Sequence, residues 1–302
     1  MSDTWNWRLL RCGAFRLDGG SMFGVVPRVV WTRLVEPDDR NRIPLQTNAL
    51  LLERNGKTVV VELGIGDKFG AKERDIYAME NRTVLDALHE AGCDASSVDA
   101  VILSHLHFDH AGALTRRPRT GEGEGPVIAF PNARIVTQRR EWEDALANRS
   151  TMHKTYLPDH LTPDVKERVL LVDTPDPAAD LDATGFDPTP VPLPGLEGIG
   201  VFRVPGHTWG QQAVMFRDGS GRTVVFTPDV MPTANHAGAA YNMAYDVEAY
   251  TSMRMRTRLL DAAAEHGWTL AIDHEPGPAL VRVERDPDKR GAYLLTPDDD
   301  AG

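Results

Sequence analysis

The residues whose types suggest chemistry are concentrated between His105 and Gly112, in the segment HLHFDHAG. Three imidazoles and one carboxylate lie within six positions. His105 and His107 are two residues apart, so both side chains can point the same way, whereas Asp109 and His110 lie further round the turn and can face a second point. Neutral imidazole and carboxylate suit zinc, and also iron, manganese or cobalt. We therefore interpret the segment as a metal-binding loop rather than a solvated polar loop.

Three later residues of the same types stand in similar settings. His207 lies in Pro-Gly-His-Thr, Asp229 in Thr-Pro-Asp and His274 in Asp-His-Glu-Pro. Each follows a short apolar run, as the first histidines do, and these runs predict strands over 98–103, 200–204, 223–226 and 269–272. Because all these groups follow strands, we expect them to gather at one end of the sheets.

The H-x-H-x-D-H pattern after a strand, followed in order by His207, Asp229 and His274, resembles the metallo-β-lactamase superfamily. The resemblance covers about residues 43–280. It implies an α/β (α+β) fold, namely a four-layer αββα sandwich. We expect residues 1–302 to form a single domain of two αβ halves, with the metal site between them.

The resemblance also implies a ligand set for two divalent ions, with zinc expected first and iron, manganese or cobalt as alternatives. The first metal is assigned His105, His107 and His207; the second is assigned Asp109, His110 and His274, with Asp229 bridging both. A metal lowers the pKa of its bound water from about 15.7 to about 7, so hydroxide is available to attack a carbonyl or phosphoryl centre. The catalytic candidates are Asp109, as a group that handles the proton, and Asp229.

Three positions depart from the family pattern without removing a ligand. Glu62-Leu63-Gly64 stands where the family commonly has Asp-Thr-Gly, so the carboxylate that supports the metal loop has a longer arm here. Pro228 precedes Asp229 where Gly is common, and the last histidine lies in Asp-His-Glu rather than Gly-His-Asp.

The N-terminal segments 18–31 and 43–52 resemble the branch that contains N-acyl-homoserine lactonases and organophosphate hydrolases. This resemblance favours a hydrolase acting on lactones or other carboxylic esters. The alternatives are a glyoxalase-II-like thioesterase, an iron-dependent sulfur dioxygenase, a phosphotriesterase, and a member that binds a ligand without turnover.

Four residues are candidates for substrate binding, each with an ordinary alternative. Phe23 and Trp31 either line an apolar pocket above the metals or pack as core. The hydroxyl of Tyr245 can donate a hydrogen bond to a substrate carbonyl, or the ring simply packs. His236 faces substrate or supports a ligand, or else lies on an exposed loop. The remaining histidines are interpreted as surface residues: His89, His153, His160 and His266.

The other elements follow from local patterns. The pair Asn55-Gly56 between apolar runs predicts a β-hairpin over 50–63. Helices are predicted over 80–92, capped by Asn81, and over 247–266, capped by Asp246 and ended by Gly267. Further strands are predicted over 134–137 and 213–216. Strands alternating with helices indicate a layered α/β or α+β domain. Segments 116–126 and 174–200, rich in Gly or Pro, are predicted as surface connections, and Asp67–Tyr77 as a lid or a dimer contact.

Composition narrows the classes of function. The chain of 302 residues has 33 Lys and Arg against 44 Asp and Glu, a formal charge of −11. This excess of acid argues against a nucleic-acid partner and against an anionic lipid surface, since both are bound by Lys and Arg. Two cysteines and the lack of an apolar stretch of about 18 residues lead us to expect a cytoplasmic protein without a membrane partner. We expect a small-molecule substrate and leave a homodimer open.

Overall fold

The computed structural model describes residues 4–181, 186 and 188–300. The chain divides into two compact units, each described by itself. Unit 1 comprises Met1–Trp5, Arg16–Leu45 and Thr174–Gly302, and unit 2 comprises Asn6–Phe15 and Gln46–Asp173. The single domain expected from the sequence stays a prediction.

Unit 2 contains a mixed sheet in which β2 pairs with β3 antiparallel, and β3, β4, β7 and β8 follow as parallel neighbours. The β2–β3 turn confirms the predicted hairpin, because Asn55 and Gly56 both have positive φ, 49° and 76°, as a two-residue turn of this kind requires. The strands of this sheet and their companions are β1 (Thr4–Asp18) and β2 (Arg42–Arg54), both shared with unit 1, then β3 (Lys57–Val61), β4 (Ala100–Ile102), β5 (Thr115–Arg116), β6 (Val127–Ile128), β7 (Arg134–Gln138) and β8 (Val169–Val172).

The helices of unit 2 pack their apolar residues against this sheet. Val84 and Leu88 of α4 and Trp142 of α6 belong to one buried cluster with Val60 of β3 and Val101 of β4. The helical segments are α3 (Ala71–Ile76), α4 (Val84–Glu90), η1 (Ala95–Ser97), α5 (Phe108–Ala111), η2 (Gly112–Leu114), α6 (Arg139–Leu146), η3 (Pro158–His160) and α7 (Pro163–Lys166).

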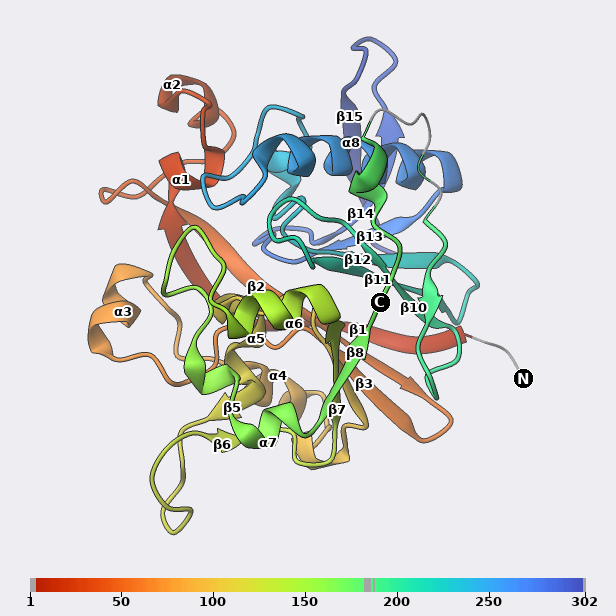
Figure 1. Ribbon diagram of the computed structural model, residues 1–302. Helices are drawn as coiled ribbons and strands as arrows, with labels where there is room; N and C mark the ends of the chain where they lie inside the picture. The colour runs from red at the N-terminus through yellow and green to blue at the C-terminus, as the bar shows by residue number, and fades with distance from the viewer. Residues whose placement is uncertain (1–3, 182–185, 187, 301–302) are drawn as a thin grey trace. The chain divides into compact units, whose positions relative to one another are not determined.

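Unit 1 contains a second mixed sheet, in the order β15-β14-β13-β12-β11, with β10 paired to β11 and to β9. Helix α8 runs along one face of these strands (Figure 1) and buries Met255, Leu259 and Leu260 in a cluster with Val225 and Leu270. The elements of unit 1 are α1 (Gly19–Phe23), α2 (Arg28–Trp31), η4 (Pro177–Asp180), β9 (Val191–Pro192), β10 (Ile199–Arg203), β11 (Gln212–Asp218), β12 (Thr223–Thr227), η5 (Ala234–His236), α8 (Ala249–His266), β13 (Thr269–Ile272), β14 (Leu280–Arg285) and β15 (Tyr293–Pro297).

The predicted α/β class is confirmed, and the strands predicted before each ligand candidate are present as β4, β10, β12 and β13. The predicted connection over 174–200 contains the short η4 and β9, and its residues 182–185 and 187 lie outside the described residues. Among the described residues, no helix combines the length and the apolar character that crossing a membrane requires.

Both predicted helix caps are wrong. Helix α4 begins at Val84, because Thr83 and Asp86 form a capping box in which the Thr83 N–H donates to Asp86 Oδ2 at 2.8 Å. Helix α8 begins at Ala249 after Glu248. The predicted cap, Asp246, has its carboxylate engaged with His207 instead, at 3.0 Å.

The end of α8 is as predicted. Gly267 has φ 65° and ψ 38°, the left-handed conformation that terminates helices and that glycine adopts without steric cost.

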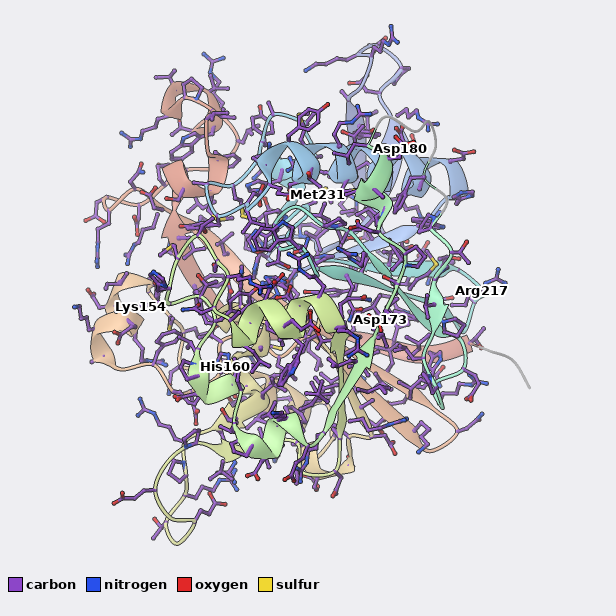
Figure 2. The ribbon with its side chains drawn as sticks, viewed as in Figure 1. Lys154, His160, Asp173, Asp180, Arg217 and Met231 are labelled. Atoms are coloured by element: carbon purple, nitrogen blue, oxygen red, sulfur yellow. The ribbon has the colours of Figure 1, made fainter. Side chains whose placement is uncertain are left out.

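His160 is not the surface residue that the sequence suggested. It is 1 % exposed, in η3 beside η2 (labelled in Figure 2), and neither ring nitrogen has a hydrogen-bond partner among the described residues. Burial, followed by the charge of Lys68, holds the pKa of His160 well below its ordinary 6.5. His89, His153 and His266 are exposed as predicted.

The capping box gives a direct test of where α4 begins. We expect Thr83→Ala to lower the free energy of unfolding by about 1 kcal/mol, because the Asp86 backbone N–H loses its hydrogen bond to the Thr83 side chain. Asn81→Ala is the matched control and should change stability less, since the Asn81 side chain accepts a solvent-exposed hydrogen bond from Arg74 Nη2 and does not cap the helix. Urea unfolding of both variants measures this, and a larger loss in Asn81→Ala would contradict the assignment.

The burial of His160 predicts a dependence of stability on pH. Its folded pKa lies below its unfolded value, so the unfolded chain binds a proton first and stability is lost as pH falls below about 6.5, by up to about 1.4 kcal/mol per pH unit. His160→Leu should therefore show a shallower loss between pH 6.5 and 5 than the native chain. His153→Leu, at an exposed position, should leave the slope unchanged. Equal slopes in all three proteins would refute this role for His160.

Candidate metal centre

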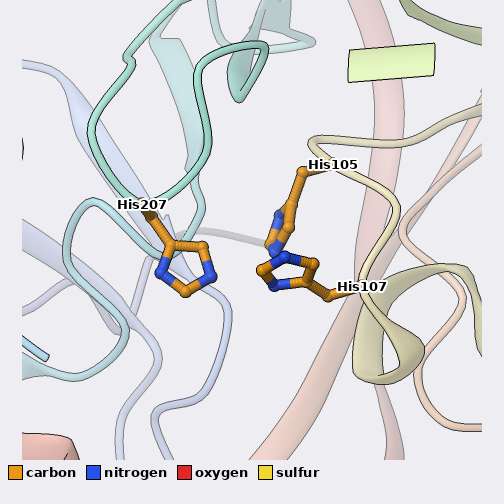
Figure 3. A group of neighbouring side chains, drawn as sticks. All are labelled: His105, His107 and His207. Carbon is orange, nitrogen blue, oxygen red and sulfur yellow. The ribbon is translucent and has the colours of Figure 1, made fainter. Parts of the chain in front are cut away.

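The histidine-rich segment of unit 2 forms a buried cluster where β4 ends and α5 begins. The rings of His105 and His107 are 4.5 Å apart between centroids, and those of His105 and His110 are 3.8 Å apart (Figure 3 shows the first pair). Asp109 Oδ1 lies 3.7 Å from His110 Nε2. None of the four side chains is more than 9 % exposed, so the alternative of a solvated polar loop is wrong.

Two buried carboxylates hold the backbone of this loop. Glu62 Oε1 accepts a hydrogen bond from the Ser104 N–H at 2.5 Å, and Glu141 Oε1 accepts one from the Leu106 N–H at 3.0 Å. The Tyr156 hydroxyl also donates to Glu141, at 2.9 Å. The backbone N–H groups of Ser104 and Leu106 are thus held by two different glutamates. This fixes the backbone on either side of His105 and so sets the direction of its side chain.

Glu62 also fixes the orientation of a ring. Its Oε2 lies 3.2 Å from Nδ1 of His110, so Nε2 is the atom of His110 that can reach a metal. Glutamate, the departure from the family pattern at this position, has a positive φ of 67°, and its carboxylate reaches both the Ser104 N–H and His110. Glu62 therefore supplies the supporting carboxylate that the sequence comparison led us to expect.

The segment Asp67–Tyr77 contacts this loop through aromatic rings. Phe69 and Tyr77 lie 5.4 and 5.6 Å from the ring of Phe108, which stands between His107 and Asp109. Burial, followed by the charge of Asp109, raises the pKa of the Tyr77 phenol. Whether the segment is a lid or a dimer contact stays a prediction.

In unit 1, His207 is held by a carboxylate at one nitrogen and faces another carboxylate with the other. Its Nδ1 lies 3.0 Å from Asp246 Oδ1 and its Nε2 lies 3.1 Å from Asp229 Oδ2. Asp229 Oδ1 in turn lies 3.3 Å from Nε2 of His274. One carboxylate therefore presents one oxygen to each of two imidazoles, the arrangement expected of a bridging ligand.

Asp273 adds a further carboxylate to this group. Asp229, Asp273 and His274 each offer a ligand atom within 4.8 Å of the others, and Asp273 Oδ1 lies 3.9 Å from Nδ1 of His274. Asp273 is 1 % exposed. A divalent cation would offset the repulsion between two buried carboxylates at this distance.

The residues of each unit fit a metal. Two ligand atoms about 2.1 Å from a tetrahedral ion lie about 3.4 Å apart, close to the 3.1 and 3.3 Å that separate Asp229 from His207 and His274. The donor set is imidazole and carboxylate in both units, and the Nδ1 contacts of His207 and His110 direct Nε2 toward a metal, as carboxylate–histidine pairs do in metal sites.

Three of the substrate candidates form one aromatic stack in unit 1. The ring of Phe23 is stacked on Trp31 at 5.5 Å and on His236 at 4.7 Å. All three are at most 1 % exposed, so the interpretation of His236 as an exposed loop residue is wrong. His236 is buried because Thr233 Oγ1 and the Met22 carbonyl satisfy its two nitrogens, at 2.8 and 2.9 Å.

This burial has an electrostatic consequence for His236. Desolvation lowers its pKa to about 3, so the ring is neutral at physiological pH and Nε2 can donate to the Met22 carbonyl. The fourth candidate, Tyr245, is half-buried. The apolar residues near the stack are mixed in exposure: Met22 is 1 % exposed, whereas Val25 is 89 % exposed.

Sequence reasoning missed Asp246, Glu141 and Asp273 as parts of the site. The pattern around Asp246 predicts a helix cap, and Glu141 is one of several charged residues of α6, so its type gives no sign that its own side chain is buried. The signal for Asp273 was present, because an aspartate stands there in place of the glycine common before the last histidine.

Comparison with known proteins gives a consistent picture. Residues 42–120 match the sequence model of the metallo-beta-lactamase superfamily. The chain is 26 % identical over 193 residues to the N-acyl homoserine lactonase AttM of Rhizobium radiobacter, and 29 % identical over 154 residues to the N-acyl homoserine lactonase AiiA of Bacillus thuringiensis subsp. kurstaki. These alignments cover 64 % and 51 % of this chain, and 64 % and 47 % of the relatives. The chain thus spans less than two thirds of the length of either relative.

Solved structures resemble the whole chain. A probable metal-dependent hydrolase from Staphylococcus aureus has a TM-score of 0.78 at 24 % identity, covering 98 % of this chain and 99 % of that one. AidC, a dizinc quorum-quenching lactonase in complex with its product, has a TM-score of 0.72 at 16 % identity with the same coverage. At these identities the likeness establishes the fold, and the predicted metallo-β-lactamase fold is confirmed.

The turn that carries His207 gives a test of packing. Gly206 has φ 137°, and a Cβ there would lie 2.4 Å from the backbone of Ser252 in α8. We expect Gly206→Ala to lower the free energy of unfolding by roughly 2–5 kcal/mol through strain and overpacking. Gly221→Ala, with φ 86° and open space around the added carbon, should cost only about 1–2 kcal/mol. Denaturant unfolding compares them, and equal losses would show that contact with α8 does not constrain the turn.

Proposed function

We propose that this chain, whose residues 42–120 match the metallo-β-lactamase superfamily, is a dinuclear metallohydrolase that opens lactones or other carboxylic esters. The observation that carries the proposal is Asp229, which directs one oxygen toward His207 and the other toward His274. A bridging carboxylate of this kind is needed where two metals share a site, and a single structural metal would not require it.

The proposed ligand set follows the order of the motifs. His105, His107 and His207 bind the first ion, Asp109, His110 and His274 bind the second, and Asp229 contacts both. Asp273 is proposed as an additional carboxylate beside His274. Two divalent ions in these positions would supply a hydroxide nucleophile at neutral pH and polarise the carbonyl of the substrate. We propose zinc, with iron, manganese or cobalt as alternatives, because imidazole and carboxylate bind all four.

Other side chains are proposed to transfer the proton, to bind the substrate carbonyl and to pack against the rest of the substrate. Asp109 holds or transfers the proton that moves from the nucleophile to the leaving oxygen, since its carboxylate is 7 % exposed and borders His110. Tyr245, half-buried, is the candidate donor to the substrate carbonyl. The buried stack of Phe23, Trp31 and His236 is proposed as the apolar wall that backs the part of the site receiving the rest of the substrate.

The substrate class rests on the relatives. AttM and AiiA are named N-acyl homoserine lactonases, and AidC is a lactonase in complex with an acyl-homoserine product. We therefore propose a small lactone as the substrate, in the cytoplasm, where Cys12 and Cys93 remain thiols. The excess of acidic residues argues against a nucleic-acid or anionic-membrane partner. Sedimentation decides between a monomer and a homodimer.

The substrate class is tested on zinc- and manganese-loaded protein with a panel of compounds. We expect turnover of acyl-homoserine lactones and aryl esters to exceed that of phosphotriesters and glutathione thioesters, because the apolar wall suits an acyl group. Preference for phosphotriesters or thioesters would replace the lactone proposal. Oxygen consumption by the iron form would identify a dioxygenase instead.

The ligand assignments are tested by substitution. We expect His107→Ala and Asp229→Asn each to lower turnover by at least a hundredfold and to reduce bound metal, with the circular dichroism spectrum unchanged. His153→Ala, at an exposed position, is the control and should retain both properties. Metal analysis together with kinetics measures this; near-native rates in both ligand variants, or native protein holding less than one metal per chain after reconstitution, would refute the assignment.

A further inference from the structure

One buried cation in unit 1 has a role that neither the ligand set nor the substrate wall explains. Arg256 of α8 is 1 % exposed, and its guanidinium donates to oxygens of a single loop, residues 230–242. Nε donates to the Val230 carbonyl at 2.7 Å and Nη2 to Asn242 Oδ1 at 2.6 Å. Nη1 lies 2.8–3.1 Å from three further carbonyls, those of His236, Gly238 and Tyr241.

Guanidinium suits this position better than any other side chain. It carries N–H donors in a fixed planar fork, whereas the ammonium of lysine is a compact group at the end of a flexible stem. Loop carbonyls buried away from water need donors, and one Arg256 supplies several of them. Burial lowers the pKa of Arg256 to about 10, which leaves it protonated at neutral pH.

The loop that Arg256 holds is continuous with both functional features of unit 1. It begins one residue after Asp229 and contains His236, which stacks on Phe23. Its far end leads to Asp246, whose Oδ2 accepts from the Met243 N–H at 3.2 Å and whose Oδ1 holds Nδ1 of His207.

Helix α8 meets the His207 turn on the same face. Ser252 is one helical turn before Arg256, and its backbone packs so closely on Gly206 that a Cβ at Gly206 would lie 2.4 Å away. One face of α8 therefore contacts the turn before His207 through Ser252 and the loop after Asp229 through Arg256.

From these contacts we infer that Arg256 is a positioning residue of the proposed metal and substrate site. It fixes residues 230–246 so that Asp246 orients His207 and His236 supports Phe23. The inference rests on the proposed function, because positioning His207 matters only if His207 binds a metal. The Arg256 side chain contacts the backbone carbonyl of His236 but none of the proposed metal ligands, so it is not a catalytic residue.

The chain offers a matched control on the same helix. Arg258 is 8 % exposed, and its guanidinium donates to the Pro177 and Asp180 carbonyls at 2.9 and 2.7 Å, in a segment that contains none of the ligand candidates. Arg256→Lys and Arg258→Lys remove the same fork at similar burial. The two variants differ in the segment whose carbonyls lose donors: residues 230–242 for Arg256→Lys, and residues 177–180 for Arg258→Lys.

The experiment uses the full chain reconstituted with zinc. Both lysine variants should lower the melting temperature. Only Arg256→Lys should speed zinc loss to a chromogenic chelator, by about tenfold or more, and raise KM for a lactone severalfold. Hydrogen exchange should increase over residues 230–246 in Arg256→Lys and over 174–180 in Arg258→Lys. If Arg256→Lys does not fold, Asn242→Ala provides a second test, because it removes one acceptor of the guanidinium. We expect Asn242→Ala to change zinc loss and KM in the same direction by a smaller factor.

Two outcomes would overturn the inference, and they are distinguishable. Equal zinc loss and equal KM in Arg256→Lys and Arg258→Lys, with native zinc binding intact, would leave the proposed function standing and reduce Arg256 to a structural residue. Failure of the native protein to retain zinc, manganese, iron or cobalt would remove the proposed function and the inference with it.

Discussion

Paired burial of imidazole and carboxylate is the constraint on which the rest of this structure depends. A partner at a ring nitrogen offsets the cost of taking an imidazole out of water, and a buried carboxylate needs donors or a cation. The same pairing occurs in both units: a carboxylate contacts Nδ1 of a histidine, and Nε2 of that ring is left to face the proposed metal site. The pairs are Glu62 with His110, and Asp246 with His207. This arrangement fixes the ring that would bind a metal before any metal arrives.

The surrounding helices and strands provide the hydrogen bonds and packing that hold these imidazole–carboxylate pairs in place. In unit 2, Glu62 and Glu141 accept backbone N–H bonds from the loop after β4, so the carboxylates that compensate the histidines also set the path of the chain. In unit 1, α8 brings its backbone against Gly206 and the guanidinium of Arg256 against the loop after Asp229. Helices and strands thus hold loops whose buried carbonyls would otherwise lack hydrogen-bond donors.

The aromatic stack of Phe23, Trp31 and His236 shows how packing and hydrogen bonding combine. His236 has no solvent exposure and is neutral, with both nitrogens satisfied by Thr233 and Met22, so it behaves as a flat ring against Phe23. Residues from the N-terminal segment and from the loop after β12 meet in this stack. Apolar packing rather than charge therefore defines this part of unit 1.

The sequence by itself determined the types of the proposed ligands, their order and their position after strands, because a strand followed by a polar loop is a local pattern. It also determined the Asn55-Gly56 hairpin and the end of α8 at Gly267, where local backbone conformation decides. The tertiary structure alone decided the partners of those ligands. Asp246 follows a helix-cap pattern, yet it binds His207, 39 residues away in sequence. Glu141 and Arg256 likewise form hydrogen bonds with backbone groups that are distant in sequence. A local sequence pattern cannot predict such contacts, because they form only when the chain folds.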